Sequence, residues 1–519
     1  MPEPDRITRN AVFIAVTISV LAVFLTPFRR DLFVGDETKY AEVIREMRNS
    51  GEWFVPTLEG APFTHKPPLH FWLIDLLTFP LGLYSTWTFV LPSLIAFIAL
   101  LWVLRRMTGD WLASFVCGTS LLVWASAQSA RMDVSFTLFL TIGAWMLFRF
   151  FEDAGRRALW LSALAFGIAT LIKGPMAPVI ALALFAFEWW RRKRVPRGNY
   201  AGALVTMIAI PLSWFVPAVI LEGQRFVNEI VMKQTVGRAV GSWVHQSPPW
   251  FYVLHSPGTL FPWFLLFVVA LWSTAEERRR PGGATLSPLA RFSISWILAV
   301  VVPYSLISSK LDVYMMAMVP PMAIVIGDFV RRASEVQARR GRIANAVTIG
   351  VLLLIGCAGP FVRLRGEGTA LMELAAVKGL FITLAIAAAV ALIVAWRSRS
   401  LAVSTLCAGL VPIVAFAYVA IALMPAANAM ATARPLIAAL DAQHVDGSSI
   451  ALYTCPHLWS RDMPRNLERV RYVSAGNIGT PAVIATSRKR ANEIASALQG
   501  YHRVAEVRMI GKWFDVYRK

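Results

Sequence analysis

The stretch VGDETKYAEVIREM, residues 34–47, places two adjacent acidic residues directly after an apolar segment. Asp36 fits the N-cap of a helix over residues 37–48, and Glu37 in the first turn suits the helix dipole. A second interpretation puts the pair at a membrane–water boundary, where one carboxylate acts as a base or positions an acceptor. Apolar residues at helical spacing predict the buried side of this helix: Tyr40, Val43, Ile44 and Met47.

The composition predicts a membrane protein with many spans. Of the 519 residues, 57% are hydrophobic and 16% are charged, whereas a soluble globular protein is about 25% charged. Apolar runs of roughly 17–25 residues recur along the chain, and each is long enough to cross a bilayer as a helix. The net charge is +20, but the basic clusters alternate with the apolar runs, as the positive-inside rule requires. We therefore expect no nucleic-acid partner.

Thirteen apolar runs are predicted to span the membrane. They are 11–27, 87–104, 111–127, 134–151, 158–172, 175–190, 201–220, 257–273, 292–308, 313–330, 343–362, 372–396 and 400–424. With a cytoplasmic N-terminus, the strong arginine clusters that follow spans all fall on the inside. These are Arg105/Arg106, Arg156/Arg157, Arg191–Arg194, Arg278–Arg280, Arg331/Arg332 with Arg339–Arg342, and Arg397/Arg399.

One further apolar segment, residues 67–83, is predicted not to cross. It is short, contains Asp75 and is interrupted by Pro80. Counting it as a span would move the later arginine clusters to the outside. We therefore expect a membrane-embedded or interfacial helix within a first outer loop of about residues 28–86, of the kind tolerated where it lines a cavity in the protein.

The C-terminal region alternates helix-like and strand-like patterns from about residue 425. We therefore predict an all-α membrane domain over residues 1–424 and a small periplasmic α/β domain over residues 425–519. The chain shows no internal repeat and no interrupted helices in matching halves, so the usual sequence pattern of a transporter is missing.

Four cations lie at junctions on the predicted outer face and together indicate an anion site. They are Lys66, Arg131, Lys173 and Lys310. Two of them have an alternative interpretation: Lys66 could snorkel to lipid headgroups, and Arg131 could form a salt bridge with Asp133. Together they could hold a phosphate and stabilise it as a leaving group. His65 has no spaced His or Cys partner, so we predict no metal site.

The loop GDETKYAEVIREMRNSGEWFVPTLEGAPFTHKPPLHFWL, residues 35–73, resembles the first periplasmic loop of bacterial GT-C glycosyltransferases related to aminoarabinose transferase and protein O-mannosyltransferases. The matching steps are Asp36–Glu37, Tyr40–Ala41, Glu46–Met47, Gly51–Glu52–Trp53, Pro56 and Lys66–Pro67–Pro68. The resemblance continues in ARMD (130–133), KGP (173–175) and SKLDVY (309–314), and covers most of residues 30–320.

This resemblance implies a multi-pass enzyme of the bacterial inner membrane that works at the periplasmic face. The donor would be a sugar on a polyprenyl phosphate, displaced with inversion at the anomeric carbon. The acceptor would be lipid A or a related glycolipid, or a protein in the mannosyltransferase branch. Apart from this lipid co-substrate, we expect no cofactor, because protein cations can bind the phosphate without a divalent metal.

The resemblance also implies roles for individual residues. Asp36 would orient or deprotonate the acceptor, with Glu37 in support and Asp133 as a second candidate acid. The donor phosphate would be held by Lys66, with Arg131, Lys173 and Lys310 as helpers. The site would be lined by Lys39, Tyr40 and Tyr314.

This chain departs from the family pattern at three places. Phe63–Thr64–His65 precede Lys66, Lys39 stands where relatives often have Arg, and Asp312 adds an acid to the SKLDVY step. The sugar or acceptor could therefore differ from that of the aminoarabinose enzyme. A transporter or flippase for a lipid-linked anion is the alternative from another class. It is disfavoured because the candidate residues lie almost entirely on one face.

Overall fold

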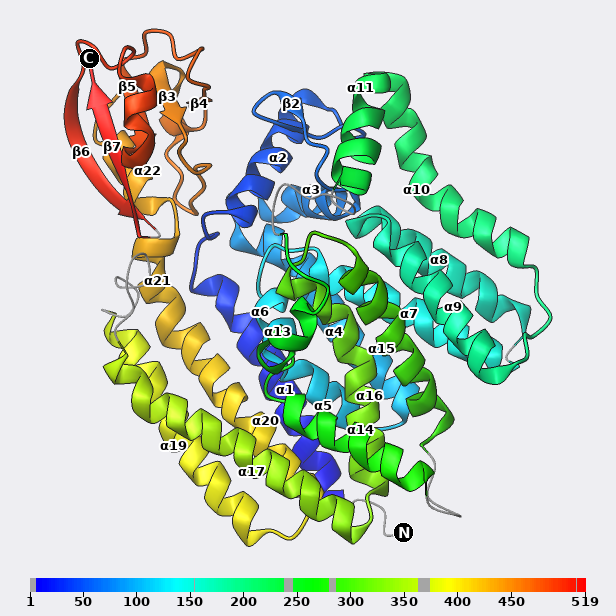
Figure 1. Cartoon of the computed structure of the whole chain (residues 1–519). Coiled ribbons are helices and arrows are strands. Elements are labelled where there is room, and N and C mark those ends of the chain that lie inside the picture. The colour runs from blue at the N-terminus through cyan, green and yellow to red at the C-terminus, as the bar shows by residue number, and fades with distance from the viewer. Residues whose placement is uncertain (1–5, 154, 238–245, 280–285, 363–373, 510) are drawn as a thin grey trace.

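The structure is a computed structural model that describes residues 6–153, 155–237, 246–279, 286–362, 374–509 and 511–519. Long helices form one bundle, and a small domain containing a sheet sits at one end of it (Figure 1). The predicted fold class, a helical membrane domain with a small C-terminal α/β domain, is confirmed.

The first half of the bundle contains α1 (Arg6–Leu25), η1 (Thr26–Phe28), α2 (Asp36–Ser50), β1 (Thr57–Leu58), β2 (Ala61–Pro62), α3 (Leu69–Leu81), α4 (Thr86–Thr108), α5 (Leu112–Gly118), α6 (Leu121–Ala127), α7 (Asp133–Phe151), α8 (Arg156–Lys173), α9 (Met176–Arg192) and α10 (Tyr200–Glu222). The second half contains α11 (Gln224–Val227), η2 (Asn228–Gly237), α13 (Phe251–Thr259), α14 (Phe264–Arg278), α15 (Pro288–Leu306), η3 (Asp312–Met318), α16 (Val319–Arg332), α17 (Glu335–Ala358), η4 (Gly359–Phe361), α19 (Ala375–Arg397), α20 (Leu401–Tyr418), η6 (Val419–Leu423) and α21 (Met424–Ala431).

Each predicted span coincides with helical structure, but thirteen crossings are not established. In the described part of the chain, nine helices are long and apolar enough to cross a membrane, or ten if the bent pair α13–α14 is one span. The predicted run 372–396 begins at two residues that lie outside the described ranges, as do Arg280 and residues 238–245 of the outer loop.

Two predicted spans are broken. The run 111–127 forms α5 and α6, and at the break the Leu121 N–H donates to the carbonyl of Phe261 at 3.1 Å instead of continuing the helix. The run 257–273 ends in α13 and restarts in α14 at an angle of 116°. Pro262 lies in this break, where it cannot donate a helical hydrogen bond.

Helix α3 is the apolar segment predicted not to cross. It has 13 residues and spans only about 20 Å, less than the ~30 Å hydrocarbon core of a bilayer. Pro80 lies inside its last turn rather than ending it.

We therefore expect both ends of α3 to be labelled from the same side of the membrane. Single cysteines at Glu52→Cys and Leu81→Cys, both exposed positions, would react with a membrane-impermeant maleimide from one side. The matched position Arg194→Cys, also exposed, would react only from the other side. Replacing the exposed Cys357 and the partly buried Cys455 by Ser removes the accessible native cysteines and leaves the buried Cys117 and Cys407. Labelling of Glu52→Cys and Leu81→Cys from opposite sides would show that α3 crosses.

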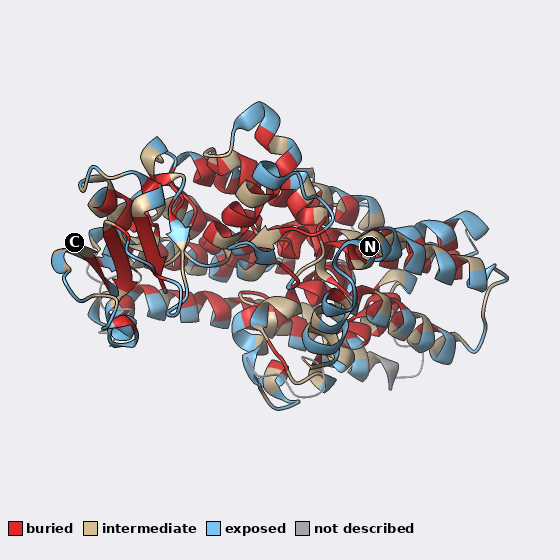
Figure 2. Ribbon diagram, turned by 90° about the horizontal axis from the view of Figure 1, so that it is seen from above, coloured by how far each residue is buried: buried red, intermediate tan, exposed pale blue. Residues whose placement is uncertain are grey.

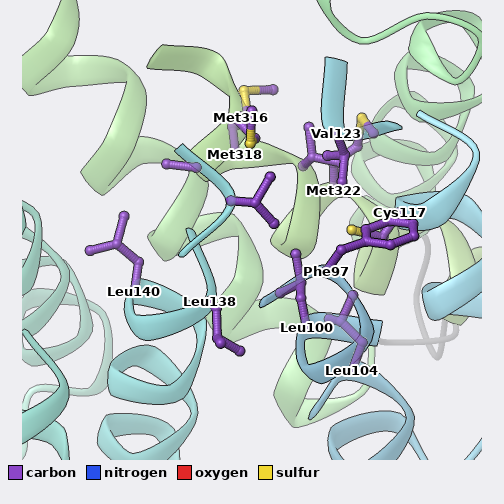
Figure 3. Packing of buried hydrophobic residues seen from close by; sticks show 14 of the residues in the cluster. Phe97, Leu100, Leu104, Cys117, Val123, Leu138, Leu140, Met316, Met318 and Met322 are labelled. Atoms are coloured by element: carbon purple, nitrogen blue, oxygen red, sulfur yellow. The ribbon is translucent and has the colours of Figure 1, made fainter. Parts of the chain in front are cut away.

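The bundle interior is a continuous apolar core. Figure 2 shows buried residues in the interior of the helices and in the sheet, with exposed residues outside. Figure 3 shows side chains of α4, α5, α6, α7, η3 and α16 meeting in this core, among them Phe97, Cys117, Val123, Leu138 and Met322. In the most apolar windows of α10 and α19, only 17% and 22% of the residues are buried. Their exposed apolar faces suit contact with lipid.

Helix α2 begins one residue earlier than predicted. Gly35 is its N-cap, with φ 127°, a conformation that glycine adopts most readily. The Gly35 N–H is 3.3 Å from the hydroxyl oxygen of Thr38, which accepts it. Asp36 is therefore the first residue of the helix and not its cap, and its carboxylate is left for other partners. The predicted apolar face of this helix is buried as expected.

The C-terminal domain contains α22 (Arg434–Asp441), η7 (Gly447–Ser449), β3 (Ile450–Tyr453), η8 (Arg465–Leu467), β4 (Arg471–Tyr472), β5 (Val483–Ser487), η9 (Arg488–Ile494), β6 (His502–Met509) and β7 (Lys512–Arg518). The sheet order is β4-β3-β5-β7-β6; β3 runs parallel to β4 and β5, and β7 is antiparallel to β5 and β6. A separate hydrophobic core begins at Ala433, while helical structure continues through residue 424 to Ala431. The exact domain boundary stays a prediction.

A buried carboxylate fastens this domain to the start of the first outer loop. Asp31 is fully buried and accepts hydrogen bonds from the Arg434 guanidinium at 2.6 and 3.0 Å and from the Ser460 hydroxyl at 2.9 Å. The Arg461 guanidinium donates to the carbonyls of Pro27 and Arg30. The C-terminal domain therefore fixes the segment that leads into α2.

Candidate active site

The Asp36 carboxylate lies at the N-terminal end of α2 and is partly open to solvent, with 40% of its side chain exposed. Its Oδ2 atom is 3.4 Å from Nη1 of Arg131, and its Oδ1 atom is 3.6 Å from Nζ of Lys39 on the next helical turn. A carboxylate that is accessible, and held by cations on two sides, can accept or orient a hydrogen-bonding substrate group.

Arg131 connects Asp36 to a second carboxylate. Its Nε atom is 3.0 Å from Oδ2 of Asp133, the first residue of α7. The other oxygen of Asp133 is 2.5 Å from Nζ of Lys173, the last residue of α8. The predicted Arg131–Asp133 salt bridge is therefore present, and Lys173 extends it. The four side chains form an alternating chain of charges, which lets charged groups persist at the edge of an apolar bundle.

Glu37 points away from this chain of charges and into the protein. It accepts two hydrogen bonds from the Arg30 guanidinium, at 2.6 and 2.8 Å, and one each from the backbone N–H groups of Phe33 and Ala130. Burial alone would raise the pKa of Glu37, but the Arg30 charge and these hydrogen bonds outweigh it and lower the pKa. Glu37 thus ties α2 to the segment that carries Arg131.

A large cavity of about 680 Å³ opens beside this cluster. The first loop, α7 to α10, η2, α15 and η3 all contribute to its walls, which are mainly apolar. Two lysines, Lys66 and Lys173, lie among the lining residues. Tyr314 also lines the cavity, stacks on Tyr304 with ring centroids 5.0 Å apart, and lies 4.9 Å from Nζ of Lys173. Apolar walls with a cationic end suit an amphipathic anion.

Two other residues predicted to belong to the site, Lys310 and Tyr40, are buried and do not line this cavity. Lys310 is 3% exposed, and its Nζ donates to the backbone carbonyls of Ser247 and Ile307 and so holds two loop segments together. Burial lowers the pKa of Lys310. Tyr40 packs edge-to-face on Phe71 of α3, and burial raises the pKa of its hydroxyl, with the nearby Asp36 and Asp133 carboxylates adding to the rise.

The structure also adds residues that sequence reasoning missed. Arg30 and Asp31 lie directly before the acidic motif, but no spacing in the sequence points to their partners. Most other cavity-lining residues belong to no motif, among them Thr170, Trp214, Gln234 and Tyr304. Within the described ranges, no three His, Cys, Asp or Glu side chains are grouped so that they could hold a metal ion.

Residues 65–215 match the family model described as dolichyl-phosphate-mannose-protein mannosyltransferase. Undecaprenyl phosphate-alpha-4-amino-4-deoxy-L-arabinose arabinosyl transferase of Pectobacterium atrosepticum is 27% identical over 398 residues, which are 72% of this chain and 70% of that protein. The protein of the same name from Pseudomonas paraeruginosa is 28% identical over 366 residues, 66% of this chain and 64% of that protein. An uncharacterised protein of Aquifex aeolicus is 26% identical, over 62% of this chain and 64% of its own length.

The crystal structure of ArnT from Cupriavidus metallidurans bound to undecaprenyl phosphate superposes with a TM-score of 0.74. The alignment covers 97% of both chains at 20% identity. The chain has the GT-C fold of aminoarabinose transferase. The ArnT structure in the apo state gives a TM-score of 0.72 at 21% identity and also covers 97% of both chains. The predicted resemblance to aminoarabinose transferase-like GT-C proteins with several membrane-spanning helices is thus confirmed.

Proposed function

We propose that this protein is an inverting glycosyltransferase that takes a sugar from a polyprenyl phosphate and transfers it to lipid A or a related envelope glycolipid. The reaction would take place at the periplasmic face of the bacterial inner membrane. The observation that carries this proposal is the apolar cavity containing Lys66 and Lys173, linked through Asp133 and Arg131 to the accessible carboxylate of Asp36. The names of the two arabinosyl transferase relatives and the undecaprenyl phosphate bound by ArnT support the same donor.

The cavity supplies both kinds of contact that an isoprenoid phosphate needs. Its apolar walls accept the lipid chain, and Lys66 and Lys173 place positive charge where the phosphate would lie. Asp133 forms a salt bridge with Lys173 and accepts a hydrogen bond from Arg131. Lys173 and Arg131 are therefore fixed before the donor arrives. Cations fixed in advance stabilise the negative charge that develops on the departing phosphate.

In the proposed displacement, an acceptor oxygen attacks the anomeric carbon from the side opposite the phosphate. The bond between that carbon and the phosphate oxygen breaks, and polyprenyl phosphate leaves with the electron pair. If the acceptor is a hydroxyl, Asp36 takes its proton; if it is a phosphate, Asp36 orients it through a hydrogen bond. Lys39 and Tyr314 would border the sugar, and the buried Glu37 and Lys310 would position the segments around it.

A protein acceptor is the second candidate, favoured by the family model that matches residues 65–215. In that case the acceptor is a hydroxyl, and Asp36 acts as a base. A transporter or flippase would use the same cationic cavity without breaking a bond.

The discriminating experiment incubates the purified protein with a polyprenyl-phosphate sugar and lipid A and follows both lipids by mass spectrometry. We expect free polyprenyl phosphate and sugar-bearing lipid A to appear in equal amounts. If the sugar is transferred only when an acceptor peptide is supplied, the protein acceptor replaces lipid A in the proposed function. If the donor stays intact with every acceptor tried, the proposal that the protein is a glycosyltransferase is contradicted.

Replacing Lys66 by Ala is expected to weaken binding of the donor roughly 10- to 100-fold, because a charge-assisted contact to the phosphate is lost. The binding of a polyprenyl-phosphate sugar to the purified protein measures this directly. The control is Lys233→Ala: Lys233 lies on η2 among cavity-lining residues, but it faces Glu229 at 3.0 Å and does not line the cavity. Equal donor binding by Lys66→Ala and the control would rule out the phosphate role.

A further inference from the structure

A second, smaller cavity lies between α17 and α19, far from the candidate active site. It has a volume of about 300 Å³ and is lined by Arg339, Arg342, Ile343, Ala346, Leu392, Ala395, Trp396, Ser398 and Arg399. We call it the arginine groove. The two helices pack closely farther from the groove, where a Cβ on Gly356 would meet the backbone of Ala385. At the arginine end they leave the groove between them.

The arginine groove is at the opposite end of the bundle from Asp36. Tyr314, which lines the active-site cavity, lies at the start of the apolar segment Asp312–Arg332. This segment of 21 residues extends for about 30 Å, and α17 begins directly after it at Glu335. In Figure 1, the lower ends of α17 and α19 lie at the opposite end of the bundle from α2, which carries Asp36. In the orientation proposed above, the groove faces the cytoplasmic leaflet.

The charge of the groove is not balanced by neighbouring acids. Three of its lining residues are arginines and none is acidic, and the described residues place no carboxylate within ion-pair distance of these arginines. Other arginines nearby are paired: Arg340 with Glu276, and Arg332 with Asp328 at 2.9 Å. The Arg342 guanidinium donates to the carbonyl of Arg399, which joins the loop after α19 to α17.

The remaining walls of the groove are apolar and lie along the outside of the bundle. Ile343 is 55% exposed and Trp396 is 86% exposed, on helices whose other outward residues are also apolar. Tryptophan is enriched at the level of lipid headgroups, where its ring is partly apolar and its N–H is polar. The groove therefore combines a cationic end with an apolar wall next to the bilayer.

We propose that the arginine groove binds a membrane phospholipid with an anionic headgroup. The headgroup phosphate would accept hydrogen bonds from Arg339 and Arg399, and one acyl chain would lie along Ile343 and Leu392. Guanidinium groups suit a phosphate because their donors match its oxygens in pairs. Basic pockets between membrane helices at the cytoplasmic side are suited to such lipids. This binding does not depend on the proposed transfer reaction.

The test uses native mass spectrometry of the full-length protein in detergent, titrated with phosphatidylglycerol. The variant R339Q/R399Q keeps Arg342 and its contact with the loop after α19, and we expect it to bind about 25-fold more weakly, or roughly fivefold for each arginine. The control R105Q/R106Q removes two arginines from the end of α4, outside the groove, and should bind like the wild type. The thermal unfolding midpoint of each variant checks its folding.

The probes separate the sources of the phosphate. We expect phosphatidylglycerol to bind more tightly than phosphatidylcholine, glycerophosphoglycerol or inorganic phosphate. If phosphatidylcholine bound as tightly as phosphatidylglycerol, the proposal would be overturned, because the groove would then not distinguish lipids by the charge of the headgroup. Equal binding of glycerophosphoglycerol or inorganic phosphate would overturn the role of the apolar wall. Wild-type affinity in folded R339Q/R399Q would exclude the groove as the site.

Discussion

The Asp36→Asn variant is expected to lose sugar transfer by about 10²- to 10⁴-fold, the range contributed by a positioned acid or base. Asparagine has nearly the same shape and keeps the first position of α2, but it cannot accept a proton or carry the negative charge that faces Arg131 and Lys39. Because Asp36 is partly exposed and its carboxylate is not the cap of the helix, folding should change little. Transfer is measured in membranes with a polyprenyl-phosphate sugar, at matched protein levels.

The control for this variant is Asp462→Asn, the same substitution at an exposed carboxylate of the C-terminal domain. It should retain wild-type transfer. Turnover by Asp36→Asn at the wild-type rate would leave Asp36 with only its salt bridges to Arg131 and Lys39.

The largest loss of stability is expected for Glu37→Gln. The substitution leaves the Arg30 guanidinium, whose side chain is 1% exposed, without its opposite charge. Removing one partner of a buried ion pair costs about 3–5 kcal/mol, because the remaining charge stays away from water. The free energy of unfolding, measured in detergent with denaturant, should fall by about this amount.

The matched control is Asp153→Asn, which removes the acid of an exposed Arg–Asp pair. Arg194 and Asp153 are 70% and 64% exposed and lie 2.9 Å apart, and a pair of this kind contributes about 0–1 kcal/mol. Asn also tolerates the positive φ of 63° at this position. Equal stability losses in the two variants would contradict the structural role assigned to Glu37.

Much of the fold follows from periodic signals in the sequence. The apolar runs predict the positions of the helices, and the short run containing Asp75 predicts the short helix α3. The stripe from Tyr40 to Met47 correctly predicts the buried side of α2, since residues three and four apart share one face of a helix. The C-terminal α/β domain is likewise evident from its change of period. These predictions need only local patterns.

Local patterns do not decide the start of α2, the break between α5 and α6, or the number of crossings. Asp36 and Gly35 are both acceptable caps, and the contact between the Gly35 N–H and Thr38 favours the glycine. The break after α5 leaves no clear local signal, because Phe261, which accepts from the Leu121 N–H, is distant in the sequence. The thirteen crossings stay a prediction for the same reason, because an apolar run of sufficient length need not form one straight helix.

The candidate site is predictable only in part. The shared site of the four outer cations stays a prediction; the structure brings two of them, Arg131 and Lys173, to the same carboxylate. Charge alone cannot distinguish a lysine that lines a cavity from Lys310, which donates to two backbone carbonyls. The contact between Asp31 and Arg434 joins residues 403 positions apart, a distance at which one sequence carries no pairing signal.

The most direct test of the proposed function is mass spectrometry of lipid A and other envelope glycolipids from cells that contain the protein, lack it, or carry Asp36→Asn. The proposed function predicts a glycolipid whose mass is increased by one sugar in the first strain and absent from the other two, and the increment identifies the sugar class. Glycolipids of identical mass in all three strains would contradict transfer to an envelope lipid.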